Sequence, residues 1–206
     1  MILFGRYASP FVRRVAVTLQ AYGMAYRHEP LSAFDDFEQI KRYNPLGRVP
    51  VLLLDSGEAL IESAAILDHL DQTAWPEAAL IAVGGEARRA TLRICALASG
   101  LCDKLVSQIY ERRNHPQPDA AWLGRCDGQV RNGLGALEAE RAAHDAPFWF
   151  GERLTHADIA VTCAISFVRA VDPSAVSKAA FPALAAYAER CEGLPPFKAA
   201  APVVAT

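Results

Sequence analysis

One change of pattern along the chain restricts its possible folds more than any other feature. Over about the first 75 residues, short apolar or β-branched runs alternate with stretches of helical periodicity, whereas from Glu86 onward only helical signals remain. Strands that alternate with helices predict an α/β layer, and a continuous series of helices predicts a separate bundle. We therefore expect an α/β domain over 1–75, a linker over 76–85 and an all-α domain over 86–206.

The first region predicts the element order β-α-β-α-β-β-α. Its last two strands should form an antiparallel hairpin, because two apolar runs flank the turn sequence Asp-Ser-Gly at 55–57. The expected elements are strands at 1–4, 25–31, 49–54 and 58–61, and helices at 9–23, 35–45 and 62–72.

The helix expected at 9–23 has typical signals at both ends. Ser9 suits the N-cap, Pro10 the first helical position and Gly23 the position just after the last turn. Ser9 allows two interpretations: its oxygen caps the helix, or its hydroxyl faces a substrate, since a helix start favours a nearby anion. The sequence has no G-x-S-x-G motif, which argues against a serine hydrolase. The apolar residues expected to face the core are Phe11, Val15, Leu19 and Tyr22.

A second candidate site surrounds the hairpin. Pro50 leads its first strand, so it either marks an edge strand or follows a cis peptide bond. A cis bond after Val49 would leave the Val49 backbone able to pair with a peptide-like ligand. Glu62 and Ser63 then open a helix directly after a strand. Ser63 suits the N-cap, the free N–H groups suit a carboxylate and Glu62 suits an ammonium group, although ordinary capping explains this pair equally well.

The second region predicts helices only. The segment 155–171 is apolar on nearly all sides, so we expect it to be the buried central helix of the bundle. The expected helices lie at 86–113, 120–144, 155–171, 181–193 and 195–201.

Composition and charge are those of an ordinary globular chain. The 206 residues carry a formal net charge of −2, and 52% of them are hydrophobic, which gives no reason to expect nucleic acid or a membrane surface as a partner. No apolar run approaches the roughly 20 residues of a membrane helix. The start at 1–10 is typical of a strand and a turn rather than of a signal peptide, so we expect a cytoplasmic protein.

The arginine pairs and the cysteines have simple interpretations. The pairs at 13–14, 88–89 and 112–113 are scattered, which is typical of solvated helix faces rather than of a nucleic-acid patch. The five cysteines are odd in number and include no C-x-x-C spacing, so they predict neither a disulfide framework nor a zinc ribbon. We expect each cysteine to be a small buried hydrophobe, and we expect no metal.

Several motifs in the same order resemble the glutathione S-transferase family. The segment 8–19 resembles the serine-type active-site start of its theta-, tau- and phi-like members and of many bacterial relatives. The segments 44–52 and 60–70 resemble the glutathione-binding half of the family, and 154–161 resembles the capping box of its second domain. The resemblance covers essentially the whole chain. It implies a thioredoxin-like α/β N-terminal domain followed by an all-α C-terminal helical domain.

The resemblance also implies a role for particular residues. Ser9 would donate its hydroxyl to the glutathione sulfur, and Tyr7 would be a wall residue. The backbone of Val49, before a cis Pro50, would pair with the cysteinyl part of glutathione. Glu62 and Ser63 would hold the γ-glutamyl end of glutathione, and Arg48 would contact its glycyl end. Thr155 and Asp158 would form a capping box with a structural role.

The activity that the resemblance implies is transfer of glutathione to a small hydrophobic electrophile by a homodimer without a metal. Two alternatives stay open: a glutathione-dependent isomerase, dehalogenase or ether-cleaving relative, and a non-enzymatic ligand-binding or interaction protein on the same fold. The first region has no cysteine, which argues against the cysteine-type relatives. Ser99 stands where many relatives have an acid, and the serine and cysteine cluster of the zeta-type isomerases is missing.

Overall fold

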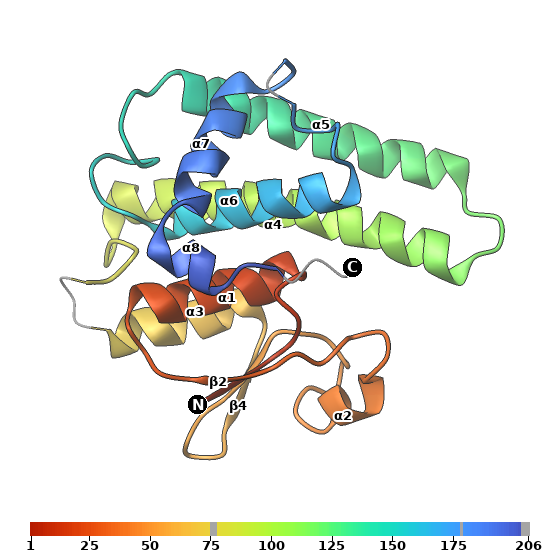
Figure 1. The fold of residues 1–206 in the computed structure, drawn as a ribbon, viewed down its shortest axis with the longest axis vertical. Coiled ribbons are helices and arrows are strands. Elements are labelled where there is room, and N and C mark those ends of the chain that lie inside the picture. The colour runs from red at the N-terminus through yellow and green to blue at the C-terminus, as the bar shows by residue number, and fades with distance from the viewer. Residues whose placement is uncertain (75–77, 178, 203–206) are drawn as a thin grey trace. The chain divides into compact units, whose positions relative to one another are not determined.

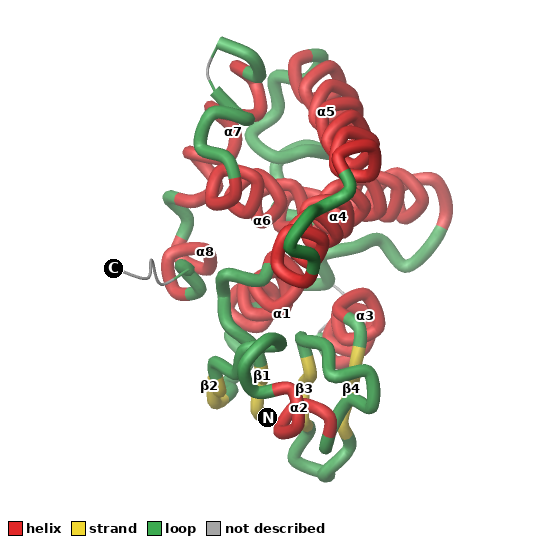
Figure 2. Tube along the Cα trace, turned by 90° about the vertical axis from the view of Figure 1, so that its right-hand side faces the viewer, coloured by secondary structure: helices red, strands yellow, loops and turns green. Residues whose placement is uncertain are grey.

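The computed structural model describes residues 1–74, 78–177 and 179–202 (Figures 1 and 2). By their contacts the residues divide into two compact units, which we call unit 1 and unit 2. Unit 1 contains Met1–Ala82 and Glu192–Thr206, and unit 2 contains Val83–Cys191.

Unit 1 is built on a four-stranded mixed sheet, and its elements follow the predicted order. Their bounds are β1 Ile2–Phe4, α1 Pro10–Ala21, β2 Arg27–Glu29, α2 Phe37–Lys41, β3 Val51–Leu53, β4 Ala59–Ile61 and α3 Ser63–Thr73. The strand order is β2-β1-β3-β4, with β1 parallel to β2 and antiparallel to β3. Strands β3 and β4 pair antiparallel, which confirms the predicted hairpin. Because β3 lies inside the sheet, the interpretation of Pro50 as a mark of an edge strand is wrong.

Both faces of this sheet are covered. Phe4 and Val51 pair across β1 and β3, and they form a core cluster with Ile40 of α2. The next pair, Leu3 and Leu52, is fully buried. Since successive side chains of a strand point to opposite faces, this pair faces α1 and α3, which lie together over the sheet in Figure 2.

The ends of α1 are formed as predicted. Ser9 is the N-cap in an extended conformation, and its Oγ accepts a hydrogen bond from the Val12 N–H at 3.4 Å. Pro10 is the first helical residue. Gly23 follows the helix with a φ of 64°, a left-handed conformation that glycine adopts without strain.

Arg13 contradicts the prediction of a solvated helix face. Its side chain is only 1% exposed, and its two terminal nitrogens donate to the Glu192 carboxylate at 2.6 and 2.5 Å. Its Nε also donates to the Ala200 carbonyl at 3.0 Å. The last helix, α8 at Pro195–Ala199, packs against α1. A buried guanidinium therefore explains why the end of the chain belongs to unit 1.

The predicted domain limits stay a prediction. Residues 75–77, which include the start of the predicted linker at 76–85, lie outside the described residues. Farther along that segment, Leu80 is buried and its N–H donates to the Tyr22 hydroxyl at 2.9 Å. This part of the predicted linker therefore packs on unit 1.

Unit 2 is entirely helical in its described part, as predicted. Helix α4 packs against both α5 and α6, and α4 and α5 form a helical hairpin in Figure 1. Eleven of the sixteen residues of α6 are buried, which confirms it as the central helix. The bounds are α4 Gly85–Asn114, α5 Ala120–Ala142, α6 His156–Val171 and α7 Pro182–Glu192.

The start of α6 carries the predicted capping box. The fully buried Asp158 carboxylate accepts hydrogen bonds from the backbone N–H and the hydroxyl of Thr155, both at 2.6 Å. It also accepts from the Trp149 N–H at 2.6 Å and from the Tyr187 hydroxyl. Burial and the neighbouring Asp158 charge raise the pKa of Tyr187, so its phenol stays a donor.

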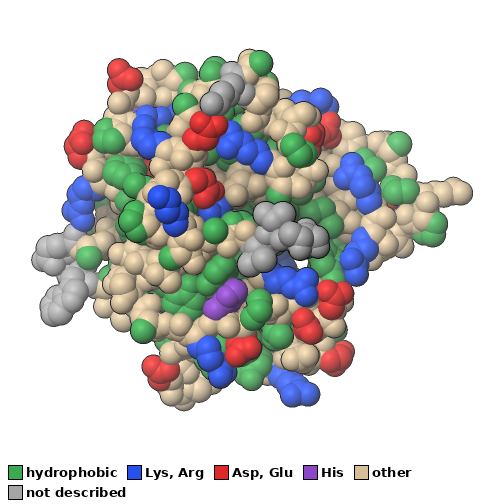
Figure 3. All heavy atoms as spheres, in the orientation of Figure 1, with side chains coloured by type: hydrophobic (Ala, Val, Ile, Leu, Met, Phe, Trp, Pro, Cys, Tyr) green, Lys and Arg blue, Asp and Glu red, His purple; other side chains and the backbone are tan. Residues whose placement is uncertain are grey.

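The remaining surface and core predictions are mostly confirmed. Arg112 and Arg113 are exposed, as is Arg89. Four of the five cysteines are buried, Cys95 is half-buried, and none of the five is in a disulfide. On the face drawn in Figure 3, acidic and basic side chains are interspersed rather than separated by sign.

Within the described residues, no helix combines the length and the apolar character needed to span a membrane.

Candidate functional site

A small cavity in unit 1 brings together most of the predicted site. It lies where the first turn of α1, the loop before β3 and the junction of β4 with α3 meet. Its lining includes Arg48, Val49, Pro50 and Glu62, but neither Ser9 nor Ser63. The other lining residues are Phe11, Asn44, Leu46 and Ile61. Three segments that are far apart in the sequence therefore contribute to one site.

Gly5 allows the turn that carries Ser9 to approach this cavity. A Cβ atom at Gly5 would come within 2.9 Å of the Val49 Cβ and within 2.5 Å of a methyl group of Val12. The φ of Gly5 is 123°, which side-chain-bearing residues rarely adopt. The backbone of the β1–α1 turn therefore packs directly against Val49, one residue before Pro50. Sequence analysis did not identify Gly5. The only feature of the sequence that could have indicated its role is its position directly after a buried strand.

The Ser9 hydroxyl is only weakly used as a cap. Its capping bond from Val12 is 3.4 Å long, beyond the usual range of about 2.7–3.2 Å for such bonds. The hydroxyl hydrogen finds no acceptor among the residues that the structure describes, and the same holds for the Phe11 N–H. A hydroxyl and a backbone N–H at a helix start are together a favourable environment for an anion.

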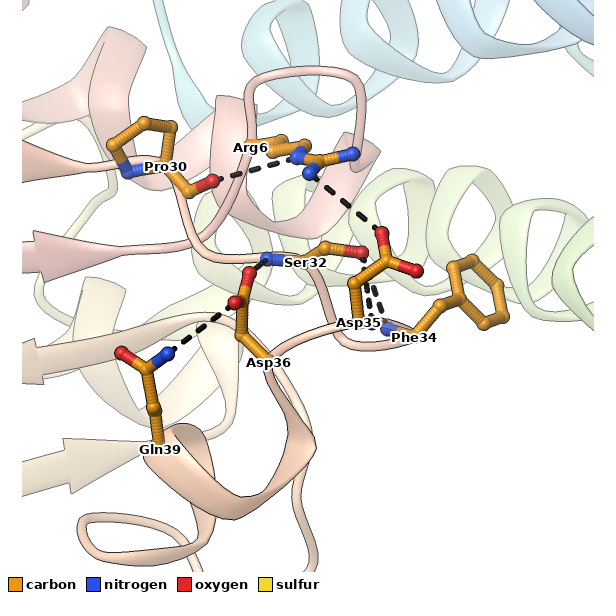
Figure 4. Close-up of polar contacts among 7 residues, drawn as sticks. All are labelled: Arg6, Pro30, Ser32, Phe34, Asp35, Asp36 and Gln39. Carbon is orange, nitrogen blue, oxygen red and sulfur yellow. Dashed lines mark hydrogen bonds and ion pairs between the residues drawn. The ribbon is translucent and has the colours of Figure 1, made fainter.

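The turn before Ser9 is held by the connection between β2 and α2 (Figure 4). The Arg6 side chain donates to the Pro30 carbonyl at 3.4 Å and pairs with Asp35 at 3.7 Å. The Ser32 hydroxyl accepts from the backbone N–H of Asp35, and the Asp36 carboxylate accepts from the N–H of Ser32. These short-range bonds give the connection a defined shape to which Arg6 can attach.

Tyr7 is engaged on the side of β2. Its hydroxyl shares a hydrogen bond of 2.7 Å with the Tyr26 hydroxyl, and its ring stacks on His28 at 3.9 Å between centroids. His28 in turn bonds through Nε2 to the Gly5 carbonyl at 2.7 Å. Burial and the bond to Tyr26 raise the pKa of Tyr7. The Tyr7 hydroxyl is therefore engaged within unit 1, and its role as a wall residue stays a prediction, since Tyr7 does not line the cavity.

The peptide bond between Val49 and Pro50 is cis, which is one of the two possibilities that the sequence left open and the one that the resemblance implied. The loop before it is held by Asn44, which is buried and donates to the Arg48 carbonyl at 2.8 Å. The Asn44 side chain also accepts from the Leu46 N–H at 3.0 Å. Neither the N–H nor the carbonyl of Val49 bonds to another residue in the described part of the chain. The Arg48 side chain is exposed at the rim.

The start of α3 corrects the prediction for Ser63. The N-cap is Glu62, whereas Ser63 is the first helical residue and is fully buried. The Ser63 hydroxyl accepts from the Arg14 guanidinium at 2.6 Å and donates to the Glu62 carboxylate at 3.3 Å. Any contact of Ser63 with a ligand must therefore come from its backbone N–H.

Glu62 has a strained backbone. Its φ is 67° with a ψ of 119°, a conformation that costs a non-glycine residue about 1–3 kcal/mol. Such outliers gather at ligand-binding sites. The strain places an exposed carboxylate at the cavity, beside a helix start that no side chain caps.

Arg14 is a further site residue that sequence analysis missed. The sequence predicted that it lies on a solvated helix face, but it is only 6% exposed and its guanidinium donates a hydrogen bond to the Ser63 hydroxyl. One signal was available, because Arg14 lies one helical turn after Pro10 and one before Thr18, on a face that is buried. Among the described residues, no group of three or more His, Cys, Asp or Glu side chains could hold a metal ion.

Comparison with known proteins decides the family. The model of the glutathione S-transferase N-terminal domain matches residues 3–78, and that of the C-terminal domain matches residues 120–190. A glutathione transferase family member from Pseudomonas fluorescens Pf-5, solved with bound glutathione, is 33% identical over 98% of this chain and 99% of its own, with a TM-score of 0.85. The chain belongs to the glutathione S-transferase family.

Two further relatives carry different activities in their names. A glutathione S-transferase from Methylobacterium radiotolerans, solved with glutathione sulfonate, is 28% identical, covers 100% of this chain and 96% of its own, and has a TM-score of 0.91. The maleylacetoacetate isomerase of Pseudomonas aeruginosa is 29% identical over 98% of this chain and 96% of its own length. The predicted family and fold class are thereby confirmed.

Proposed function

We propose that this chain is a glutathione-dependent enzyme that transfers the glutathione thiolate to a small hydrophobic electrophile. The observation that carries the proposal is the Ser9 hydroxyl. It lies at a helix start, its capping bond is long, and its hydrogen has no acceptor in the described chain. The family supports the proposal, since structures of relatives contain glutathione or glutathione sulfonate.

Each part of glutathione has a proposed partner in unit 1. The unpaired N–H and carbonyl of Val49 would bond to the cysteinyl residue, as one peptide unit bonds to another across a sheet. The Glu62 carboxylate would take the γ-glutamyl ammonium, and the Ser63 N–H the γ-glutamyl carboxylate at the start of α3. The exposed Arg48 would meet the glycyl carboxylate.

A hydrogen bond from Ser9 to the glutathione sulfur would be sufficient to lower the thiol pKa. A free thiol has a pKa of ~8.5, and lowering it by about 2 units requires roughly 2.7 kcal/mol of preferential stabilisation of the thiolate. One charge-assisted hydrogen bond from Ser9 supplies about 1.5–3 kcal/mol. The start of α1, including the Phe11 N–H, adds roughly 0.3–1 kcal/mol. Thiolate formation then needs no general base beside Ser9.

The isomerase alternative has its own support. Two relatives named maleylacetoacetate isomerase match this chain at 29% identity over 98% of its length. Against it, the serine and cysteine cluster of that class is missing at the turn before α1. Analysis of products separates the two reactions, since a conjugate retains glutathione and an isomerase releases it unchanged.

Two further elements of the proposal come from the sequence prediction: a homodimer and a cytoplasmic location. The alternative from another class is a ligand-binding or interaction protein without catalysis. The strained Glu62 favours a ligand-binding site over a pure interaction scaffold, which would gain nothing from its cost.

The test is calorimetric titration of reduced glutathione into the wild type and into Ser9→Ala near pH 7, with proton release measured in buffers of different ionisation enthalpy. We expect the wild type to bind and release a proton, and Ser9→Ala to bind with much less release. Equal release by both proteins would leave Ser9 as a helix cap. No binding by either protein would support the scaffold alternative.

A further inference from the structure

The turn between β1 and α1 carries Ser9, and strand β2 holds the first residue of this turn by both of its backbone groups. The Gly5 N–H donates to the Glu29 carbonyl at 2.9 Å, and the Gly5 carbonyl bonds to His28 Nε2 at 2.7 Å. A carbonyl oxygen only accepts, so His28 Nε2 carries the hydrogen. The first bond continues the pairing of β1 with β2, whereas the second is made by a side chain and depends on the residue at position 28.

The His28 ring contacts the turn at a second point. The Tyr7 ring stacks on it, with 3.9 Å between the centroids and 4° between the planes. Tyr7 lies two residues after Gly5 and two before Ser9, so His28 contacts the turn on both sides of Arg6. Within the same turn the Ser9 N–H donates to the Arg6 carbonyl at 3.0 Å. A short, hydrogen-bonded piece of backbone therefore connects His28 with Ser9.

The other side of Gly5 packs against Val12 and Val49 so closely that no side chain fits there. The Gly5 peptide is therefore fixed between His28 on β2 and the loop before β3. Gly5 is buried, and a buried carbonyl that loses its donor is unfavourable, so the backbone rearranges to find another partner. A rearrangement at this point moves the backbone that leads to Ser9. Hydrogen bonds weaken steeply when they are misaligned, so such a movement weakens any bond that the Ser9 hydroxyl donates.

We propose that His28 is a positioning residue, which directs the Ser9 hydroxyl toward the glutathione sulfur by holding the Gly5 carbonyl. This inference rests on the proposed function of Ser9. His28 does not line the cavity and its Nε2 is already bonded, so it acts through Gly5 rather than on the thiol itself. The competing explanation is that His28 only stabilises β2, which is an edge strand of the sheet. In that case a substitution changes stability but leaves the pKa of the bound thiol unchanged.

The test measures the thiol pKa of bound glutathione, from the ultraviolet absorbance of its thiolate as a function of pH, together with turnover. His28→Phe keeps a ring that can stack on Tyr7 but removes the donor to Gly5. We expect this variant to raise the thiol pKa by at least about half as much as Ser9→Ala does, and to lower turnover at least about threefold. Urea denaturation verifies that each variant is folded and measures its stability.

Further variants separate positioning from stability. In His28→Gln the amide nitrogen is the same number of bonds from Cα as Nε2, so this variant should have a thiol pKa and a turnover close to those of the wild type. Tyr26→Phe is the matched control, because it removes the hydroxyl that bonds to Tyr7 at 2.7 Å and leaves the bond from His28 to Gly5 intact. It should lose stability without a shift in the thiol pKa. If His28→Phe does not fold, His28→Asn takes its place, since its amide nitrogen is one bond closer to Cα and falls short of the carbonyl.

Several outcomes would overturn the proposal. An unchanged thiol pKa in His28→Phe, beside a raised one in Ser9→Ala, would limit His28 to the stability of β2 and leave the proposed function standing. Equal shifts in His28→Phe and His28→Gln would show that the donor to Gly5 is not the cause, and an equal shift in Tyr26→Phe would show a general loosening of the turn. A wild-type thiol pKa equal to that of free glutathione would overturn the proposed function itself, and the role of His28 with it.

Discussion

The start of α6 in unit 2 differs from the starts of α1 and α3 in unit 1 in how many of its hydrogen-bonding groups are satisfied. At α6 in unit 2, the buried Asp158 carboxylate receives hydrogen bonds from four donors of Thr155, Trp149 and Tyr187. At α1 in unit 1, the Ser9 oxygen makes one long capping bond, and α3 has no side-chain cap at all. The sequence signals are nevertheless of the same kind, a small hydroxyl residue or an acid just before a helix.

The difference separates structural from functional helix starts. A helix start whose donors and acceptors are all paired within the protein has no group left to bind a ligand, and removing its capping residue destabilises the fold. A start with unused donors is incomplete by itself, and it is stabilised when an anion binds. The four predictions below test this distinction.

The largest expected effect is on stability in unit 2. Asp158→Ala leaves several buried donors without an acceptor, and we expect the free energy of unfolding to fall by about 4 kcal/mol. Urea denaturation measures it. Asp119→Ala is the control, since Asp119 caps α5 at an exposed position and its loss should cost only about 1 kcal/mol. Equal losses of unfolding free energy in the two variants would show that the α6 start contributes no more to stability than an ordinary exposed cap.

The second effect is on turnover in unit 1. Ser9→Ala should lower turnover with glutathione and a reactive aryl halide at least about tenfold, which corresponds to about 1.4 kcal/mol of transition-state stabilisation. Its stability should fall by less than about 1 kcal/mol, because the capping bond is long. A large loss of stability with unchanged turnover would make Ser9 an ordinary cap like Thr155.

The third effect separates the strain at Glu62 from its charge. Glu62→Ala and Glu62→Gly both remove the carboxylate, so both should weaken glutathione affinity more than they lower turnover at saturation. Only glycine relieves the positive φ, so Glu62→Gly should be about 1 kcal/mol more stable than Glu62→Ala. Calorimetry and urea denaturation provide the two readouts. Unchanged affinity in both variants would exclude the γ-glutamyl role.

The smallest expected effect is at Tyr7. Tyr7→Phe removes the hydrogen bond to Tyr26, which should cost about 1 kcal/mol of stability. Turnover should change by less than about twofold, since the Tyr7 hydroxyl is already engaged away from Ser9. A loss of turnover as large as that of Ser9→Ala would transfer the sulfur contact to Tyr7.

Much of the fold and part of the site could be predicted from sequence. The order of elements, the Ser9 cap with Pro10 behind it, the hairpin, the cis bond before Pro50 and the box at Thr155 and Asp158 are all present. Each of these depends on residues within a few positions of one another, or on one strand and its neighbouring turn. Such signals are readable because the partners are adjacent in the chain.

The misassigned residues depend on partners far along the chain. Arg14 meets Ser63 across 49 positions, and Arg13 meets Glu192 across 179. An arginine in a helix is solvated by default, and only a distant acceptor makes its burial tolerable. For the same reason Ser63 resembled a helix cap, because nothing near it in sequence shows that Arg14 already holds its hydroxyl.

The sequence by itself determined the two kinds of region, the family and the local helix starts, since these are recorded in spacing and turn chemistry. Tertiary structure alone decided which polar groups are hydrogen-bonded within the protein and which keep an unused donor or acceptor. It buried Arg13 and Arg14, attached the C-terminal segment to α1 and strained Glu62. The physical reason is that hydrogen-bond satisfaction depends on every group within reach in space, whereas sequence patterns report only on groups within reach along the chain.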